Sequence, residues 1–212
     1  DVSIAFANEL AQICERVGAD FLKVRALINK SPGRNVLLAG GGVGGHCIPK
    51  DPWLLAYGAP DLDPLLLRAS RARNEGMPIH VADLVAAVLS DGKKSISGAR
   101  IAVLGMSYLE DSDDMRHTPS EALVAELEAR GATVVPHDPY VHRFAGDLGT
   151  AVAGVDCIVL MVAHTEYKNL DWKQLGSLVA HRAVVDARFV VDGAQMAENN
   201  FSFRGVGRPR GH

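Results

Sequence analysis

The sequence predicts an α/β protein in which a helical half, residues 1–95, precedes a Rossmann-like doubly wound parallel sheet, residues 96–212. Apolar residues of the first half recur at the spacing of amphipathic helices. In the second half, short apolar runs alternate with helical patterns, which is typical of a parallel sheet covered on both faces. Between them, residues 90–94 combine a helix stop with polar residues, so we place the domain boundary near residue 95.

The helices of the first half follow from repeating apolar faces. Between residues 2 and 17, apolar side chains fall on one helical face, and Gly18 then supplies a stop. The same spacing returns in shorter stretches. We expect helices over residues 2–17, 21–28 and 61–74, a short one that opens at Pro52, and another that starts at Met77.

The second half changes its period at Arg100, where a continuous apolar run predicts a buried strand. Three shorter apolar runs predict the other strands, and amphipathic stretches lie between them. We expect strands over residues 100–105, 133–136, 156–162 and 183–186, and helices over 119–130, 148–153 and 172–179. The tail from Gly205 to Gly211 is expected to be poorly ordered.

Composition narrows the class of protein. The 212 residues carry a net charge of −3, which gives no reason to expect a nucleic acid or an anionic membrane as partner. Three cysteines without repeat spacing indicate a reducing compartment, the cytoplasm, instead of a disulfide scaffold. The sequence begins at Asp1, inside a helical pattern, so we expect it to be part of a longer chain.

The most unusual stretch runs from Gly40 to Pro52 and reads GGGVGGHCIPKDP. Its glycines weaken helix and strand alike, so the run indicates positive φ angles or a close approach of backbone to other atoms. Cys47 follows the glycines, and Asp51 lies four residues later on a segment stiffened by Pro49 and Pro52. This pattern suits a thiol nucleophile with an acid/base group nearby.

Simpler interpretations of this stretch stay open. A lone cysteine is more often a small buried hydrophobic residue than a nucleophile. A metal site at His46 and Cys47 is weakly supported, because neither Cys14 nor Cys157 lies at zinc-ligand spacing. The literal match to G-x-G-x-x-G is no dinucleotide fingerprint, because prolines follow where a helix should open.

The sequence GGGVGGHCIPKDPWLL resembles the active-site loop of the UDP-glucose/GDP-mannose dehydrogenase superfamily, in the form found in UDP-N-acetylmannosamine dehydrogenases. The resemblance implies an NAD-dependent four-electron oxidation of the 6-hydroxyl of a UDP-sugar to the uronic acid. It makes Cys47 the nucleophile that forms a thiohemiacetal and then a thioester. It makes Asp51 the group that positions or deprotonates the hydrolytic water, and it places Gly42, Val43 and Gly44 against the substrate.

A second segment, Tyr108 to Arg116, resembles the nucleotide-sugar-binding segment of that superfamily. Tyr108 stands at the aromatic position and implies substrate contact, whereas Arg116 implies contact with NAD. Leu109 replaces the usual lysine. The resemblance also makes Arg188, in an Asp-x-Arg motif, a substrate-binding residue, and Arg34 would supply charge to the substrate.

Other polar residues of the second half have plain interpretations. The acidic run Glu110, Asp111, Asp113 and Asp114 lacks the glycine and the last glutamate of a calcium loop, so we expect a solvated loop and no metal. Asp138 alone reads as a turn former, although its Asp-Pro pair matches a motif of the superfamily.

The resemblance covers residues 2 to about 195, the C-terminal two-thirds of a superfamily member. We therefore expect the NAD-binding domain to lie outside this sequence. The resemblance also implies a homodimer through the helix that begins at Asp1. Three alternatives stay open: a non-catalytic nucleotide-sugar-binding or dimerisation module, a dehydrogenase of UDP-glucose or GDP-mannose, and a free-standing thiol hydrolase, which would need a histidine base beside Cys47.

Overall fold

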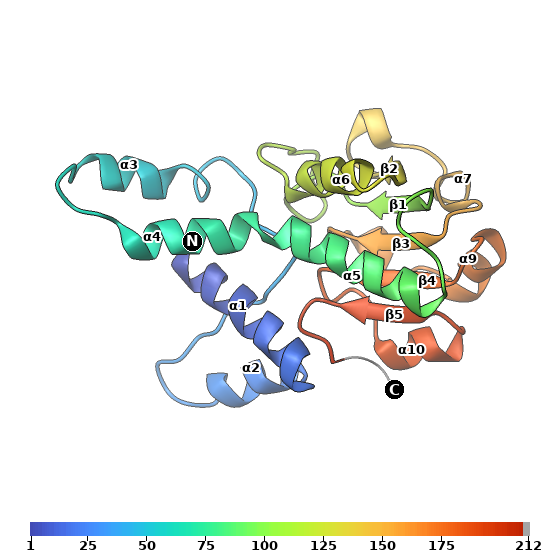
Figure 1. The fold of residues 1–212 in the computed structure, drawn as a ribbon, viewed down its shortest axis with the longest axis horizontal. Helices are drawn as coiled ribbons and strands as arrows, with labels where there is room; N and C mark the ends of the chain where they lie inside the picture. The colour runs from blue at the N-terminus through green and yellow to red at the C-terminus, as the bar shows by residue number, and fades with distance from the viewer. Residues whose placement is uncertain (210–212) are drawn as a thin grey trace.

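A computed structural model describes residues 1–209 of the chain. Figure 1 shows a helical part on the left, a sheet flanked by helices on the right, and one long helix, α5, that runs from one to the other. The helices of the first half are α1 (Val2–Val17), α2 (Phe21–Asn29), α3 (Asp51–Tyr57), α4 (Leu65–Glu75) and α5 (Met77–Asp91).

Five parallel strands form one sheet in the order β2-β1-β3-β4-β5. Their bounds are β1 (Arg100–Leu104), β2 (Thr133–His137), β3 (Cys157–Leu160), β4 (Ala183–Asp186) and β5 (Ser202–Gly205). Residues of β1 and β3 are buried on both faces, as their continuous apolar sequences predict. The predicted fold class, helices followed by a doubly wound parallel sheet, is confirmed.

Two apolar cores lie on opposite faces of the sheet. One contains Val103 and Val159 together with side chains from α1, α5 and α6 (Pro119–Ala129). The other contains Leu104 and Leu160 together with side chains from the remaining helices. Those helices are α7 (Leu148–Val152), α8 (Thr165–Lys168), α9 (Trp172–Leu178) and α10 (Gly193–Glu198), and a short 3-10 helix, η1 (His142–Phe144), precedes them. The first core joins both halves of the chain, because α5 packs on the sheet.

Capping residues determine where α1 ends and where α2 begins. Gly18 adopts a left-handed φ of 74° and ends α1, with its N–H bonded to the carbonyl of Cys14. Asp20 then caps α2 by accepting from the N–H of Lys23 at 3.0 Å. The short connection between these caps turns α2 back beside the C-terminal end of α1.

The prediction of a poorly ordered tail is wrong for residues 205–209. Ser202 to Gly205 pair with β4, and Gly207 lies against Phe21, where an added Cβ would be 2.6 Å from the Cβ of that side chain. The N–H of Phe21 donates to the carbonyl of Gly207 at 2.9 Å, and the N–H of Gly207 donates to Glu15 at 2.7 Å. The rest of that prediction, on residues 210 and 211, lies outside the described residues. Among residues 1–209, every helix is too short or too polar to span a bilayer.

Candidate active site

Cys47 lies on the loop between residues 40–45, which we call the glycine run, and α3. It is exposed. Its carbonyl oxygen accepts from the N–H groups of Lys50 at 3.1 Å and of Asp51 at 2.8 Å, so the loop folds back into α3. Asp51 is the first residue of α3, where free N–H groups favour a negative charge. Cys47 and Asp51 line the same cavity of about 520 Å³. Its other lining residues are Asp1, Val2, Ser3, Ile48, Pro52, Leu55 and Leu67.

The three thiols differ in their surroundings. Cys14 is buried on the core side of α1, and Cys157 is buried in β3. Burial raises the pKa of the Cys14 thiol, and it raises the pKa of the Cys157 thiol strongly, because the charged form would lose its water. Cys47 is the exposed thiol of the three.

The glycines of the run are needed for packing within the chain. An added Cβ at Gly42 would lie 2.6 Å from the Cβ of Pro119, and one at Gly44 would lie 2.6 Å from the Cβ of Tyr108. Real side chains do not approach this closely, so backbone of the first half must lie directly on the second half. Packing within the protein therefore accounts for the missing side chains at Gly42 and Gly44, and contact of these residues with a substrate stays a prediction.

Three hydrogen bonds hold the glycine run from different elements. The N–H of Gly40 donates to Asn8 Oδ1 on α1 at 2.9 Å. The carbonyl of Gly42 accepts at 3.2 Å from Nη2 of Arg188, a residue that follows the end of β4. The N–H of Gly45 donates to the carbonyl of Arg116 at 2.7 Å. The loop that carries Cys47 is therefore fixed by both halves of the chain.

A buried polar network, which was not predicted from the sequence, holds the glycine run at Gly40. Asn8 Nδ2 donates to Asn74 Oδ1 at 2.9 Å, and Asn74 Nδ2 donates to Asp1 Oδ1 at 2.6 Å. Arg71 also donates to Asp1 Oδ1, at 3.1 Å. Asn8, Arg71 and Asn74 are each at most 3% exposed, although polar residues within helical patterns ordinarily face water.

The remaining predicted residues fall into two groups. Tyr108 lies against the glycine run, and its ring is 3.0 Å from a Cβ built at Gly45. Arg188 also faces the protein, because its Nε donates to the carbonyl of Met161 at 3.0 Å, and burial lowers its pKa. Val43 is half-buried beside them. Arg34, in contrast, is exposed on the loop after α2 and does not line the cavity of Cys47.

Comparison with protein families decides which protein class has this arrangement. The central domain of the UDP-glucose/GDP-mannose dehydrogenase family matches residues 1–76, and the UDP-binding domain of that family matches residues 102–193. The chain belongs to the UDP-glucose/GDP-mannose dehydrogenase family. The glycine run and Cys47 lie in its central domain, and Tyr108 and Arg116 lie in its UDP-binding domain.

Relatives of known identity agree with this assignment. A UDP-N-acetyl-D-mannosamine dehydrogenase from Pyrococcus horikoshii is 36% identical over 208 residues, which are 98% of this chain and 49% of that protein. A solved structure of such a dehydrogenase from the same organism superimposes with a TM-score of 0.88 at 35% identity, over 98% of this chain and 49% of its own. An NDP-N-acetyl-D-galactosaminuronic acid dehydrogenase from Methanosarcina mazei gives a TM-score of 0.92 at 32% identity, over 98% and 48%. The chain spans about half the length of the relatives it matches, which corrects the expected two-thirds.

In the UDP-binding domain of this dehydrogenase family member, the carboxyl ends of β1, β2 and β3 meet at Asp138. This buried carboxylate accepts from the N–H groups of Met106 and Ser107, at 2.6 and 3.0 Å, and from His164 Nε2 at 3.1 Å. These hydrogen bonds outweigh burial and hold the pKa of Asp138 far below its usual value. His164 Nδ1 accepts from the N–H of Asp111 at 2.9 Å, so Nε2 is the ring nitrogen that donates to Asp138. Asp138 thus organises the loop that carries Tyr108, well beyond a simple turn.

The acidic run is a solvated loop, since Glu110, Asp111 and Asp113 are exposed, and two of its carboxylates also form contacts that hold the loop. Asp111 accepts from the N–H of Thr165 at 2.8 Å and from its hydroxyl at 2.7 Å, so it caps α8. Asp114 forms a forked ion pair with Arg116, which lowers the pKa of Asp114 to about 2. Within residues 1–209, no group of three or more histidine, cysteine and acidic side chains is arranged to hold a metal ion.

Proposed function

We propose that this chain is the central and UDP-binding part of an NAD-dependent dehydrogenase that oxidises the 6-hydroxyl of a UDP-sugar to the carboxylate. The observation that carries the proposal is the shared cavity of Cys47 and Asp51, in a chain 36% identical to a UDP-N-acetyl-D-mannosamine dehydrogenase. UDP-N-acetylmannosamine is accordingly the substrate that we propose first.

In this proposal Cys47 holds the substrate carbon through the reaction. The thiolate adds to the C6 aldehyde and forms a thiohemiacetal, which becomes a thioester on the second oxidation. Water then attacks the thioester carbon, Asp51 takes the proton of that water, and the thiolate leaves as the carboxylate forms. NAD, when bound, accepts the two electrons of each oxidation.

Residues of the UDP-binding domain would contact both NAD and the UDP-sugar, together with the glycines of the central domain. Arg116 is the residue that we propose for NAD, since its side chain is 59% exposed and Asp114 keeps its guanidinium oriented, which fits an edge contact with an anionic cofactor. Tyr108 would contact the substrate beside Gly42, Val43 and Gly44. Arg188 would contribute by fixing the glycine run, with one guanidinium edge toward the substrate.

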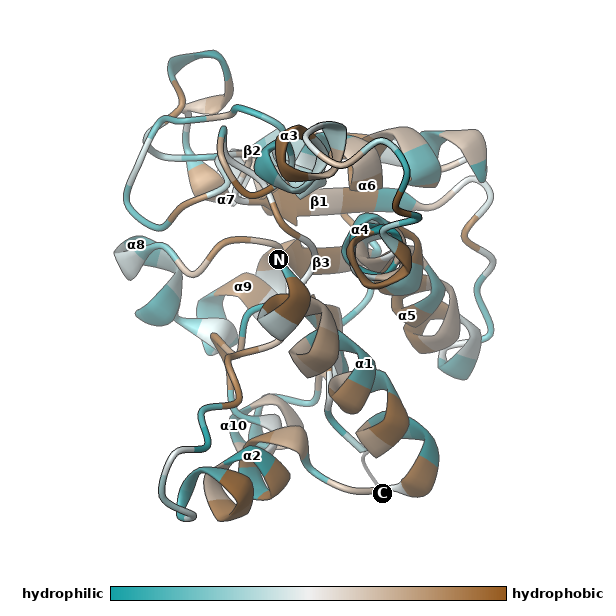
Figure 2. Ribbon diagram, turned by 90° about the vertical axis from the view of Figure 1, so that its left-hand side faces the viewer, coloured by the Kyte–Doolittle hydropathy of each residue, from teal (hydrophilic) through white to brown (hydrophobic). Residues whose placement is uncertain are grey.

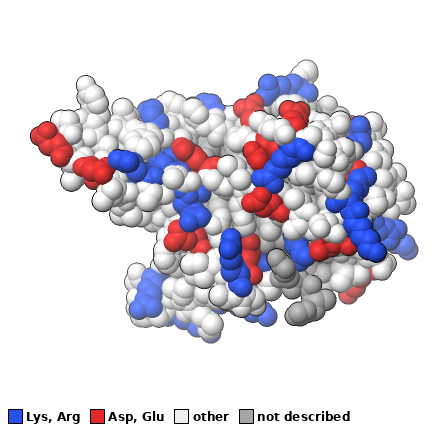
Figure 3. Space-filling model, in the orientation of Figure 1, with Lys and Arg blue, Asp and Glu red and all other residues white. Residues whose placement is uncertain are grey.

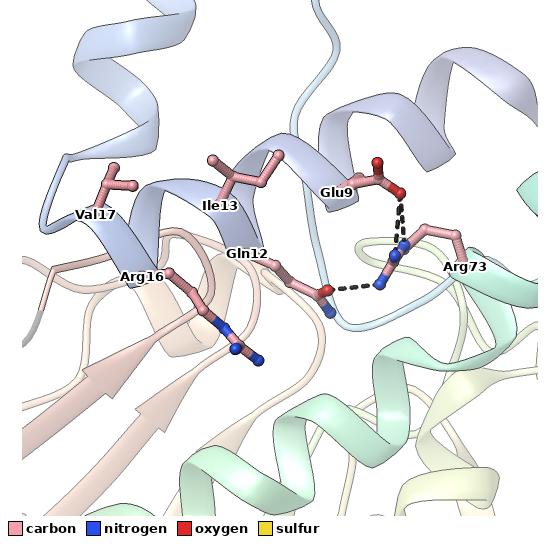
Figure 4. A pocket seen from close by; sticks show the side chains of 6 residues that line it. All are labelled: Glu9, Gln12, Ile13, Arg16, Val17 and Arg73. Carbon is pink, nitrogen blue, oxygen red and sulfur yellow. Dashed lines mark hydrogen bonds and ion pairs between the residues drawn. The ribbon is translucent and has the colours of Figure 1, made fainter.

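A homodimer is part of the proposal, because α1 retains apolar side chains on its outer side. Phe6 is 57%, Ile13 51% and Val17 71% exposed. Ile13 and Val17 line a hollow of about 380 Å³. Figure 4 shows that Arg73 of α4 bridges Glu9 and Gln12 of α1 there. Arg34, which lies outside the cavity of its own Cys47, would reach the substrate of the other copy.

The test is turnover of UDP-N-acetylmannosamine, UDP-glucose and GDP-mannose with NAD by the full-length protein, followed by absorbance of NADH. We expect UDP-N-acetylmannosamine to be oxidised fastest, with two NADH formed per uronic acid. Cys47→Ser should release no uronic acid, and Asp51→Asn should accumulate a sugar adduct in intact-mass spectra. If the Cys47→Ser variant forms uronic acid at the native rate, the assignment of Cys47 as the nucleophile is refuted.

The second candidate, a non-catalytic nucleotide-sugar-binding module, is favoured by Leu109. This side chain is 52% exposed where the family usually has a lysine, so a cation that could reach a phosphate is missing. Binding of UDP-sugars measured by calorimetry, with no NADH formed from any of the three substrates, would support the module and overturn the enzyme.

A further inference from the structure

The last strand of the sheet, β5, has a free outer edge. Figure 1 shows β5 as the lowest strand, with β4 on one side only. The N–H groups of Ser202 and Val206 donate to the carbonyls of Arg182 and Asp186, at 2.7 and 3.0 Å. Because alternate residues of a parallel strand bond to the same neighbour, the main-chain groups of Phe203 point away from β4. Within residues 1–209, neither its N–H nor its carbonyl has a hydrogen-bond partner.

The opposite edge of the sheet is closed to further pairing. On β2, the N–H of Thr133 donates to the carbonyl of Ala99 at 2.8 Å, toward β1. Pro136, three residues later, is therefore directed outward, and it has no N–H to donate. The inner strand β3, coloured as hydrophobic in Figure 2, is enclosed by two neighbours. β5 contains no proline, so it is the edge at which another strand can be added.

A cavity of about 760 Å³ lies along this edge. Its walls come from β5, from α10 on one face of the sheet and from the end of α5 on the other. Phe203 and the exposed Ala194 and Ala197 of α10 make one side apolar. On the other side, Arg204 of β5 forms an ion pair with Asp91 of α5. The volume lies within the range of about 300–1,000 Å³ that is usual for binding sites.

One carboxylate of the cavity has no counter-ion. Asp91 is paired with Arg204, and Asp20 is paired with Arg208 at 2.8 Å. Asp192 is exposed, and within residues 1–209 its carboxylate is bonded only to a main-chain N–H of α10, at 3.3 Å. Figure 3 shows acidic and basic side chains interspersed over the sheet part of the molecule, so the unpaired charge is a local feature. The cavity therefore favours a ligand with a basic group beside Asp192.

Arg204 lacks a hydrogen-bond acceptor at the same edge. Its Nε is buried and has no partner within residues 1–209. A buried donor without an acceptor is unfavourable, and the main-chain carbonyl of an added strand is an acceptor of the kind that is missing. We propose that β5 binds an extended peptide segment of another protein as a further strand, with an apolar side chain over Phe203 and a basic side chain at Asp192.

These two side chains would be two residues apart in the bound segment. Gly193, which follows Asp192, lies against the ring of Phe203, 3.6 Å from a built Cβ, so both contacts are on the α10 side. Alternate residues of a strand face the same side, which sets the spacing. Cys47 does not line this cavity, so the contact is separate from the proposed dehydrogenase reaction.

The probe is the peptide acetyl-Thr-Val-Thr-Arg-Thr-amide, which places valine and arginine on one side of a strand. Its binding to the full-length protein is measured by calorimetry, without NAD or nucleotide sugar. The control peptide has N-methyl groups on its three inner residues, so it keeps the side chains and loses the main-chain donors. We expect the control to bind at least tenfold more weakly, and hydrogen exchange at the Phe203 amide to slow at least tenfold when the probe saturates the protein.

The charge is tested by Asp192→Asn, because asparagine caps a helix as well as aspartate does. This variant should bind the probe at least fivefold more weakly, and a probe with glutamine in place of arginine should bind the variant and the native protein equally. The matched control, Asp171→Asn, makes the same change at the cap of α9, outside the cavity, and should leave binding unchanged.

Several outcomes would overturn the proposal. They are no binding of the probe at millimolar concentration, equal binding of the N-methylated peptide, unchanged exchange at Phe203, or full affinity in Asp192→Asn. A Phe203 amide that is already protected in the free protein would show that the protein covers its own edge, and this too would overturn it. Because neither NAD nor nucleotide sugar is present, each outcome is independent of whether the protein is a dehydrogenase.

Discussion

Replacement of Gly44 by alanine tests the idea that the glycine run is a contact between the two halves of the chain. The new Cβ would lie 2.6 Å from the Cβ of Tyr108, 2.8 Å from the carbonyl oxygen of His117 and 3.2 Å from the Cδ of Pro119. A backbone carbonyl and a proline ring cannot turn aside as the end of a long side chain can. Overpacking ordinarily lowers the free energy of unfolding by about 1–3 kcal/mol. We expect Gly44→Ala to lower it by about 3 kcal/mol, because backbone atoms must move to make room.

The assay is equilibrium unfolding in urea, with two variants as controls. Gly146 has no atom within 4 Å of a built Cβ, so Gly146→Ala should be neutral or more stable by up to about 1 kcal/mol. Gly41→Ala meets the flexible end of Met161 at 2.8 Å and should cost less than Gly44→Ala. If Gly44→Ala unfolds at the same urea concentration as the native protein, the packing explanation is refuted.

Three further predictions concern the groups around the site. Asn8→Ala leaves the N–H of Gly40 and the amide oxygen of Asn74 without their partner, so urea unfolding should show a loss of about 2–4 kcal/mol. Brief alkylation of the folded protein, mapped by mass spectrometry, should label Cys47 before the two buried cysteines, whose raised pKa values keep them protonated. The folded pKa of Asp138 is depressed, so its contribution to stability is complete above its unfolded pKa of about 4 and is lost at lower pH. The stability difference between the native protein and Asp138→Asn, on the order of 3 kcal/mol at pH 7, should therefore shrink below pH 4, and an unchanged difference at pH 2 to 3 would contradict this.

Patterns that depend on sequence neighbours predicted the structure well. The apolar face from residue 2 to 17 became α1, and the continuous run after Arg100 became β1, because periodicity reports burial directly. The strand β5 and the helix α10 were missed, since they have four and six residues and no clear period. Their stability comes from pairing with β4 and from the core beneath them, which a local pattern does not contain.

The shared cavity of Cys47 and Asp51 could be predicted from the sequence, whereas the residues that support the loop could not. Cys47 and Asp51 are close in sequence, so their common cavity follows from one short turn. Asn8 and Asn74 meet over 66 residues, and each reads in the sequence as one more polar residue on a helix. The glycines indicated that other atoms lie close to the backbone. The absence of a side chain does not reveal whether those atoms belong to a ligand or to the protein.

The way the glycine run is held has a consequence for how the two halves act together. Gly45 is bonded to the carbonyl of Arg116, and Cys47 follows two residues later. Arg116 belongs to the loop that Tyr108 closes, since the N–H of Tyr108 donates to the carbonyl of Asp114 at 3.0 Å. Any ligand that orders this loop therefore also restrains the backbone beside the thiol. The position of Cys47 is thus set by the UDP-binding domain as much as by the central domain that carries it.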